Sequence, residues 1–238
     1  MTEPILKTEA KSDDDHIVYD LTNSSHTSNL FPKKVWKTHY QNALDELDKA
    51  EQLSTLQPFQ GEYKLRKEIS RYLERIRGVK CHPDQIIITI GLQQSLDYIC
   101  QFLGNTKRSV LMEDPSYPKA REIFKKNAYP IVTAEVDEKG LDLTKVDRSS
   151  EIEMIYTTPS HQFPLGMIMP ISRRRELLSF AEAYNSFILE DDYDSELRYY
   201  QRPIPALKSI DYLGRVIYLG TFSKILSPSF RMGYMVLP

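Results

Sequence analysis

A single lysine, Lys224, lies between small hydroxyl residues in the stretch GTFSKILSPSFRMGY, residues 220–234, and Arg231 follows it. A lysine amine in a desolvated pocket near another cation can be activated for imine chemistry. The planar fork of an arginine suits the oxygens of a phosphate. Most lysines are solvated surface residues, so the interpretation of Lys224 depends on what the rest of the chain brings near it.

Further residues suited to chemistry directly follow short apolar runs. In open α/β sheets, ligands collect at the carboxyl ends of the strands. We therefore expect an anion site, an aromatic plate, a carboxylate and a lysine to converge on one sheet edge. The residues that follow the runs are Gly91, Leu92, Gln93, Gln94 and Ser95, then 113–117, 160–166 and 190–193, and finally Thr221, Ser223 and Lys224.

The elements that must position these residues follow from hydrophobic spacing. Apolar residues recur at helical intervals in 35–47, 61–78, 92–104 and 172–185. Strand-like runs lie at 84–91, 109–114, 130–136, 153–159, 186–192, 215–220 and 234–238. This alternation predicts an α/β fold with a mostly parallel sheet sandwiched by helices. We divide the chain into a polar linker or arm (1–30), a helical segment (31–60) and a large domain (61–238).

The composition excludes several classes of protein. The net charge of −2 is spread along the 238 residues and gives no electrostatic footprint of a nucleic-acid binder. Cys81 and Cys100, the only cysteines, are too few for a disulfide framework or a cysteine-rich metal site, so we expect ordinary thiols and no metal. No long apolar segment or signal peptide is present. We expect a cytoplasmic protein without membrane contact.

Five motifs together resemble the fold-type-I aminotransferase superfamily, which uses pyridoxal 5′-phosphate. They are GLQQSLD, EDPSYP, TTPSHQFPLG, ILEDDYDSE and GTFSKILSPSFRMGY, and the resemblance runs from about Phe31 to Pro238. Within the superfamily, PSHQFPLG and EDDYDSE resemble the MocR/GabR-type bacterial regulators. The resemblance implies that the sheet belongs to the large, cofactor-binding domain of such a protein.

The resemblance also implies a role for each motif residue. Lys224 would bind the cofactor as an imine, and Asp191 would face the ring nitrogen and keep it protonated. We choose Asp191 because it lies two residues before Tyr193, whose hydroxyl would reach the ring oxygen; for Asp192 a structural hydrogen bond is the better interpretation. Tyr117 would stack on the ring. The phosphate would bind at a helix N-terminus, surrounded by Gly91, Leu92, Gln93, Thr221, Ser223 and Arg231.

Three positions depart from the superfamily pattern. Phe163 stands where an asparagine usually reaches the ring oxygen, and His161 or Gln162 could substitute for it. Leu56 aligns with the usual tyrosine from the partner subunit, which leaves one phosphate contact in question. Lys119 lies two positions after the stacking tyrosine, where it could bind the carboxylate of an amino acid; the alternative is an exposed helix lysine.

The resemblance also sets expectations for the ends of the chain and for function. A regulator of this type carries an N-terminal winged helix-turn-helix, which residues 1–30 lack, and a C-terminal small domain, which is missing after Pro238. We therefore expect an incomplete large domain that does not bind DNA directly, from a full-length protein that is a homodimer. It would sense an amino-acid effector. The alternatives are part of an aminotransferase acting on an amino acid and a 2-oxo acid, or an inactive fragment, and little turnover is expected of this chain.

Overall fold

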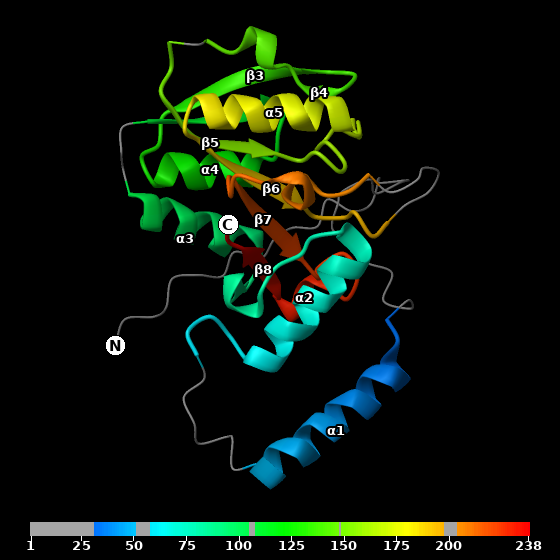
Figure 1. The fold of residues 1–238 in the computed structure, drawn as a ribbon. Helices are drawn as coiled ribbons and strands as arrows, with labels where there is room; N and C mark the ends of the chain where they lie inside the picture. Colours follow the sequence, from blue (N-terminus) through cyan, green and yellow to red (C-terminus); the bar gives the residue numbers. More distant parts are fainter. Residues whose placement is uncertain (1–30, 51–57, 105–107, 148, 198–203) are drawn as a thin grey trace, which may run out of the picture. The chain divides into compact units, whose positions relative to one another are not determined.

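Eight strands in the described part of the chain form one sheet, in the order β1-β8-β7-β6-β5-β2-β3-β4 (Figure 1). The computed structural model describes residues 31–50, 58–104, 108–147, 149–197 and 204–238. The strands are β1 Ile86–Thr89, β2 Ser109–Asp114, β3 Ile131–Asp137, β4 Gly140–Leu141, β5 Ile152–Thr157, β6 Phe187–Asp192, β7 Val216–Thr221 and β8 Gly233–Val236. The helices are α1 Lys33–Ala50, α2 Tyr63–Arg77, α3 Leu92–Leu103, α4 Pro118–Lys126 and α5 Ile171–Ala183.

The central strands of the sheet run parallel. Strands β3, β2, β5, β6 and β7 pair in that order with parallel register. Strand β8 pairs antiparallel with both β7 and β1, and β4 pairs antiparallel with β3. The parallel pairing aligns the carboxyl ends of five strands at one edge, which is where the sequence places its chemically suited residues.

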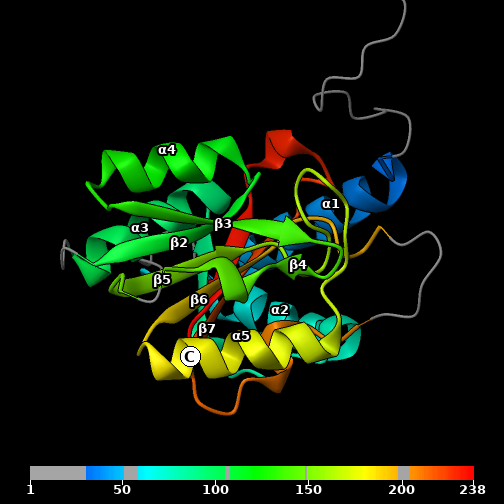
Figure 2. The same cartoon turned by 90° about the horizontal axis from the view of Figure 1, so that it is seen from above.

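Helices cover both faces of the sheet (Figure 2). On one face, α3 and α4 pack on β2, β5, β6 and β7 through a core that includes Leu96, Phe124 and Tyr156. On the other face, α5 packs on the same strands through a second core that includes Leu177 and Ile188. A third core lies between α2 and the strands β1, β7 and β8. Strands buried on both faces account for their nearly continuous apolar runs.

Local signals in the sequence explain where α2 begins and ends. The Glu62 side chain accepts a hydrogen bond from the Leu65 amide (2.6 Å), which satisfies one of the first amides of the helix. Gly78 ends the helix in the left-handed conformation, with φ of 70°. Between these caps, Ile69 and Leu73 lie buried on one face of α2. The apolar residues that recur at helical intervals in this part of the sequence are therefore buried or half-buried.

The structure confirms the predicted fold class and the strand and helix segments assigned from the sequence. The proposed arm at residues 1–30 and the departure at Leu56 lie outside the described residues. Over the described ranges, no helix is long and apolar enough to cross a membrane. Nor does that part of the chain bring together three or more His, Cys, Asp or Glu side chains that could hold a metal ion.

Candidate functional site

A tight turn between β1 and α3 forms the first corner of the site. Gly91 caps α3 with φ of 127°, a conformation that residues with a side chain rarely adopt. The Ile90 amide donates to Gln94 Oε1 (2.9 Å), and the Thr89 and Ser95 hydroxyls lie 2.9 Å apart. These bonds hold the turn before α3, whose first amides have no acceptor within the helix. Such a helix start binds anions.

The segment before β8 completes this corner. Gly233 packs directly on the turn, because a Cβ atom built on Gly233 would lie 2.8 Å from the Cα of Gly91. A Cβ atom built on Gly91 would lie 3.9 Å from Arg231 Nη2, so the guanidinium borders the turn. Thr221 pairs with Gly233 across the sheet, and its hydroxyl lies 3.0 Å from that of Ser223. The predicted phosphate-binding residues Gly91, Thr221, Ser223 and Arg231 are therefore brought together.

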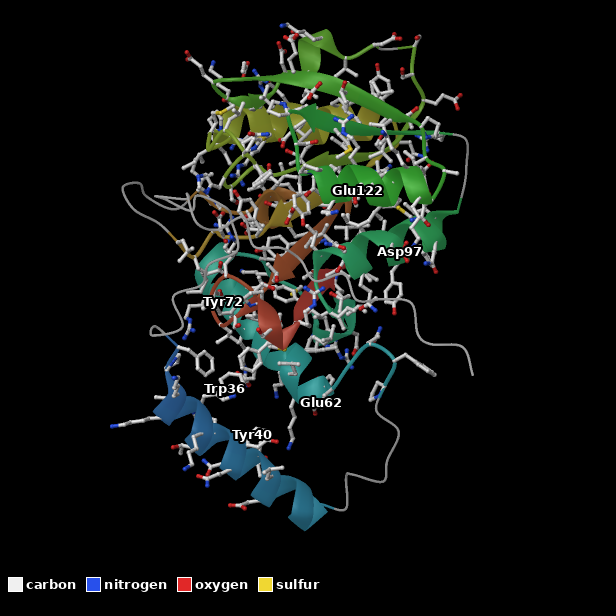
Figure 3. The ribbon with its side chains drawn as sticks, turned by 180° about the vertical axis from the view of Figure 1, so that it is seen from behind. Trp36, Tyr40, Glu62, Tyr72, Asp97 and Glu122 are labelled. Atoms are coloured by element: carbon white, nitrogen blue, oxygen red, sulfur yellow. The ribbon has the colours of Figure 1, made fainter. Side chains whose placement is uncertain are left out.

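A surface hollow of about 510 Å³ adjoins this corner between α3 and α4. Gln93 and Arg231 line it from the side of the turn. Asp97 on α3 and Glu122 on α4, both labelled in Figure 3, also line it. Gln93, predicted to contribute its backbone amide, thus lies at the border between the turn and an open surface.

Three consecutive acidic residues end β6, and their side chains take different partners. Glu190 accepts bonds from the amides of Leu207 (2.7 Å) and Lys208 (2.8 Å). Asp192 pairs with Arg77 Nε at 2.7 Å and accepts a bond from the Tyr218 hydroxyl at 2.5 Å. These contacts assign both side chains to the interior, and they favour a structural role for Asp192.

Asp191 points to the opposite face of the sheet, toward α3. Its carboxylate accepts a hydrogen bond from the Tyr156 hydroxyl (2.5 Å). Burial raises its pKa to about 7, and the negative charges of Asp192, Asp194 and Glu113 add to this, against the hydrogen bond from Tyr156. Among the described residues, no lysine or arginine forms an ion pair with it. A buried carboxylate that has only one neutral hydrogen-bond donor can still bind a cationic partner.

An aromatic wall stands beside these carboxylates. The Phe163 ring packs edge-on against Tyr117 (ring centroids 5.7 Å apart) and against Tyr193 (6.1 Å). Tyr117 precedes α4 and is half-buried. Phe163, which the sequence marked only as a departure from the superfamily pattern, is thus the link between two predicted cofactor-binding tyrosines.

His161 bonds to Asp194, whose pKa also responds to the charge of Lys224. The His161 Nδ1 atom lies 2.7 Å from Asp194 Oδ2, and the imidazole stacks parallel to the Tyr193 ring. Burial raises the pKa of Asp194, whereas the bond from His161 and the positive charge of Lys224 oppose that rise. Lys224 itself is half-buried after β7. The positive charge of Lys224, the residue predicted to hold the cofactor, thus acts on the carboxylate of Asp194.

Two residues predicted to bind a ligand make other contacts in the structure. Gln162 is buried, and its side-chain amide bonds with Glu113, with the Pro115 carbonyl and with the Leu165 amide. This geometry favours a structural role for Gln162. Lys119 is exposed and pairs with Glu122 one helical turn away (3.0 Å), so in this state its ammonium faces solvent.

Some residues of the site were not singled out from the sequence. Tyr156 holds Asp191, Arg77 holds Asp192, and Glu113 holds the segment that carries Phe163. Glu113 stood among the residues after a strand, without a role of its own. A signal for Tyr156 exists in hindsight, because a tyrosine near the end of a doubly buried strand needs a partner for its hydroxyl.

Comparison with known proteins identifies the family. The sequence profile described as "Aminotransferase class I and II" matches residues 21–238, and the chain belongs to this family. It is 44% identical over 211 residues to "Uncharacterized HTH-type transcriptional regulator YdeL" of Bacillus subtilis (strain 168). The match covers 89% of this chain and 45% of YdeL. It is 40% identical over 178 residues to "Probable rhizopine catabolism regulatory protein MocR" of Rhizobium meliloti, covering 75% of this chain and 36% of MocR.

Solved structures agree with this assignment. Kynurenine aminotransferase of Pyrococcus horikoshii, solved in complex with PMP, matches with a TM-score of 0.76 and 32% identity over 87% of this chain and 52% of that one. The chain thus spans about half the length, or less, of the relatives it matches. The family and this PMP-bound structure support pyridoxal phosphate as the cofactor, and the MocR/GabR resemblance seen in the sequence is confirmed.

Proposed function

We propose that this chain forms the part of a MocR/GabR-type regulator that binds pyridoxal phosphate and senses an amino acid. The similarity to YdeL and MocR supports the regulator class. The observation that carries the cofactor assignment is Asp191, a buried carboxylate at the carboxyl edge of the sheet without an ion-pair partner among the described residues. A protonated pyridine nitrogen would supply the missing positive charge.

The other residues around Asp191 divide the remaining tasks. Lys224 would hold the cofactor covalently, Tyr117 would cover the ring, and Tyr193 would donate a hydrogen bond to the ring oxygen. The α3 turn and Arg231 would bind the phosphate. When bound, pyridoxal phosphate supplies an aldehyde carbon that condenses with amines and a protonated ring that withdraws electrons. Asp191 would keep that ring nitrogen protonated.

The segment after β5 favours a sensor over an enzyme. Phe163 offers no polar atom to the ring oxygen, and the Gln162 side chain bonds with Glu113 and backbone groups. One donor that an aminotransferase usually presents to the ring is thus replaced by a phenyl group. The second candidate is an aminotransferase domain acting on an amino acid and a 2-oxo acid, which the likeness to kynurenine aminotransferase supports. In either case we propose a homodimeric full-length protein in the cytoplasm.

Absorbance spectroscopy tests the proposal. Wild-type protein mixed with pyridoxal phosphate should develop the visible band of a lysine-bound cofactor, and Lys224→Ala should lack it. Lys126→Ala is the matched control, because Lys126 is an exposed lysine on α4. An unchanged band in Lys224→Ala would overturn the cofactor site.

A second measurement separates sensor from enzyme. Amino acids and 2-oxo acids are added in turn to the cofactor-loaded protein, and pyridoxamine phosphate is quantified by chromatography. A sensor should change its spectrum with one class of amine but form pyridoxamine phosphate more slowly than about one turnover per second, the lower range of enzymes. Faster conversion would establish the aminotransferase instead.

A further inference from the structure

Glu113, at the carboxyl end of β2, is fully buried and bonded on both carboxylate oxygens. Oε1 accepts a hydrogen bond from the Thr157 hydroxyl (2.5 Å), and Oε2 accepts one from the Thr158 hydroxyl (2.9 Å). The Thr158 amide lies within 3.4 Å of both oxygens, and Gln162 Nε2 lies 3.3 Å from Oε2. A buried carboxylate is tolerated only when donors surround it. Glu113 therefore acts inside the protein and has no face toward a ligand.

Two of these donors also hold the backbone of Phe163. The Phe163 amide donates to Thr158 Oγ1 (3.0 Å), and the Phe163 carbonyl accepts from Gln162 Nε2 (2.8 Å). Both backbone polar groups of Phe163 are thus anchored by side chains that themselves bond to Glu113. The backbone of Phe163 is thus linked to the Glu113 carboxylate by the side chains of Thr158 and Gln162.

The same cluster reaches the segment that carries Tyr117. Gln162 Nε2 donates to the Pro115 carbonyl (2.8 Å), two residues before Tyr117. Gln162 Oε1 accepts from the Leu165 amide (3.0 Å), which closes the turn after Phe163. Gln162 therefore joins the segment after β2 to the segment after β5, and the edge-on contact between Phe163 and Tyr117 lies at this junction.

We propose that Glu113, with Thr158 and Gln162, is a positioning residue that sets the aromatic wall of the site by fixing Phe163 against Tyr117 and Tyr193. We call these three residues the Glu113 clamp. The proposal rests on the proposed function only where it concerns the cofactor, since the order of residues 158–166 can be measured without any ligand. Loss of the clamp should loosen that segment and change how a bound ring is held, while the sheet stays intact.

Two substitutions break the clamp by different routes. Glu113→Gln keeps the shape but turns one acceptor oxygen into a donor amide, which faces the Thr158 N–H. Thr158→Val removes one hydroxyl that bonds to both Glu113 and Phe163. Thr158→Ser retains that hydroxyl and should therefore keep the clamp intact. Glu122→Gln, an exposed glutamate on α4, is the matched control for the charge change.

Amide hydrogen exchange of the ligand-free protein is the first readout. Glu113→Gln and Thr158→Val should speed exchange within residues 158–166 by about tenfold or more, with α5 unchanged. Thr158→Ser and Glu122→Gln should match wild type. Wild-type exchange in both clamp variants would overturn the proposal. Equal acceleration throughout the domain would also overturn it, since this would indicate general destabilisation.

The circular dichroism of the visible cofactor band is the second readout, because it reports how asymmetrically the ring is held. The two clamp variants should lose about half of this signal or more while still binding pyridoxal phosphate. If wild type itself shows no band, the proposed function fails and the exchange experiment still decides on the clamp. If Glu113→Gln does not fold, Thr158→Val alone decides.

Discussion

Asp191 and Asp192 are neighbours in β6, yet their carboxylates lie on opposite faces of the sheet. Asp191 bonds to Tyr156 on the α3 face, and Asp192 bonds to Arg77 of α2 and to Tyr218. Successive side chains of a strand alternate between faces, so one residue in the EDD run can face a ligand while its neighbours bind the protein. Asp192 already has a cationic partner in Arg77, which favours Asp191 as the carboxylate that faces a ligand.

The first prediction compares these two aspartates. Asp191→Asn should weaken pyridoxal phosphate binding by about tenfold to a hundredfold, the value of a lost hydrogen bond to a charged group. Asp192→Asn should change the affinity much less. It should instead lower the free energy of unfolding by about 3 kcal/mol or more, because Arg77 stays buried without its charged partner. Cofactor titration and urea unfolding measure the two effects, and equal affinity losses would show that the wrong carboxylate was chosen.

The second prediction concerns pH and the cofactor-free protein. The pKa of Asp191 is raised from 3.8 to about 7 by burial, so between these values the native state holds a proton that the unfolded state has released. The contribution of Asp191 to stability must therefore fall as pH rises through this window, by about 1.4 kcal/mol per pH unit, and stay level above it.

Asp191→Asn is the control for that slope, because asparagine does not ionise. The free energy of unfolding should fall more steeply with pH in wild type than in the variant between about pH 4 and pH 7. The two curves should run parallel above about pH 7.5. Urea unfolding across this range measures both, and parallel curves throughout would show that Asp191 is ionised in the folded protein.

The sheet was predictable because its strands are buried on both faces and are therefore written as continuous apolar runs. Helix α4 was not assigned, since it is only nine residues long and only Ala120 and Phe124 of these are buried. The direction of β8, which runs antiparallel to both of its neighbours β1 and β7, was equally hidden. Strand direction depends on how the chain crosses between elements, which local spacing does not record.

The candidate site likewise contains residues that the sequence identifies and residues that only the fold identifies. Motif residues such as Lys224 and Gly91 could be singled out from the sequence, and their roles stay predictions. The roles of Tyr156 and Glu113 depend on strand order: β5 lies between β2 and β6, which brings Tyr156 to Asp191 and Thr157 to Glu113. Partners in these pairs are separated by 35 and 44 residues, so only the assembled sheet reveals them.

The third prediction uses the two glycines that cap α3. Gly91 and Gly104 both have positive φ, 127° and 70°, so alanine at either position should cost about 1–3 kcal/mol of stability through backbone strain. Only Gly91 borders Arg231, whereas an added Cβ on Gly104 would meet no atom within 4 Å. Gly91→Ala should therefore weaken pyridoxal phosphate binding and Gly104→Ala should not. Similar affinities for pyridoxal phosphate in the two variants would show that the phosphate does not bind at the α3 turn.

The fourth prediction tests the proposed contact between Arg231 and the phosphate. Arg231 and Lys126 both line the hollow beside α3, but only Arg231 borders the Gly91 turn. Arg231→Gln should weaken pyridoxal phosphate binding by about tenfold and flatten its dependence on salt, because a charge-assisted contact is lost.

Pyridoxal, which lacks the phosphate, is the decisive comparison. It should bind equally well to wild type and to Arg231→Gln, since the other expected ring contacts, Asp191 and Tyr117, are unchanged in this variant. Lys126→Gln removes one charge from the same hollow and should affect neither ligand. Absorbance titrations of both ligands measure these affinities. An equal loss for pyridoxal and pyridoxal phosphate in Arg231→Gln would mean that Arg231 supports the fold of the corner and does not bind the phosphate.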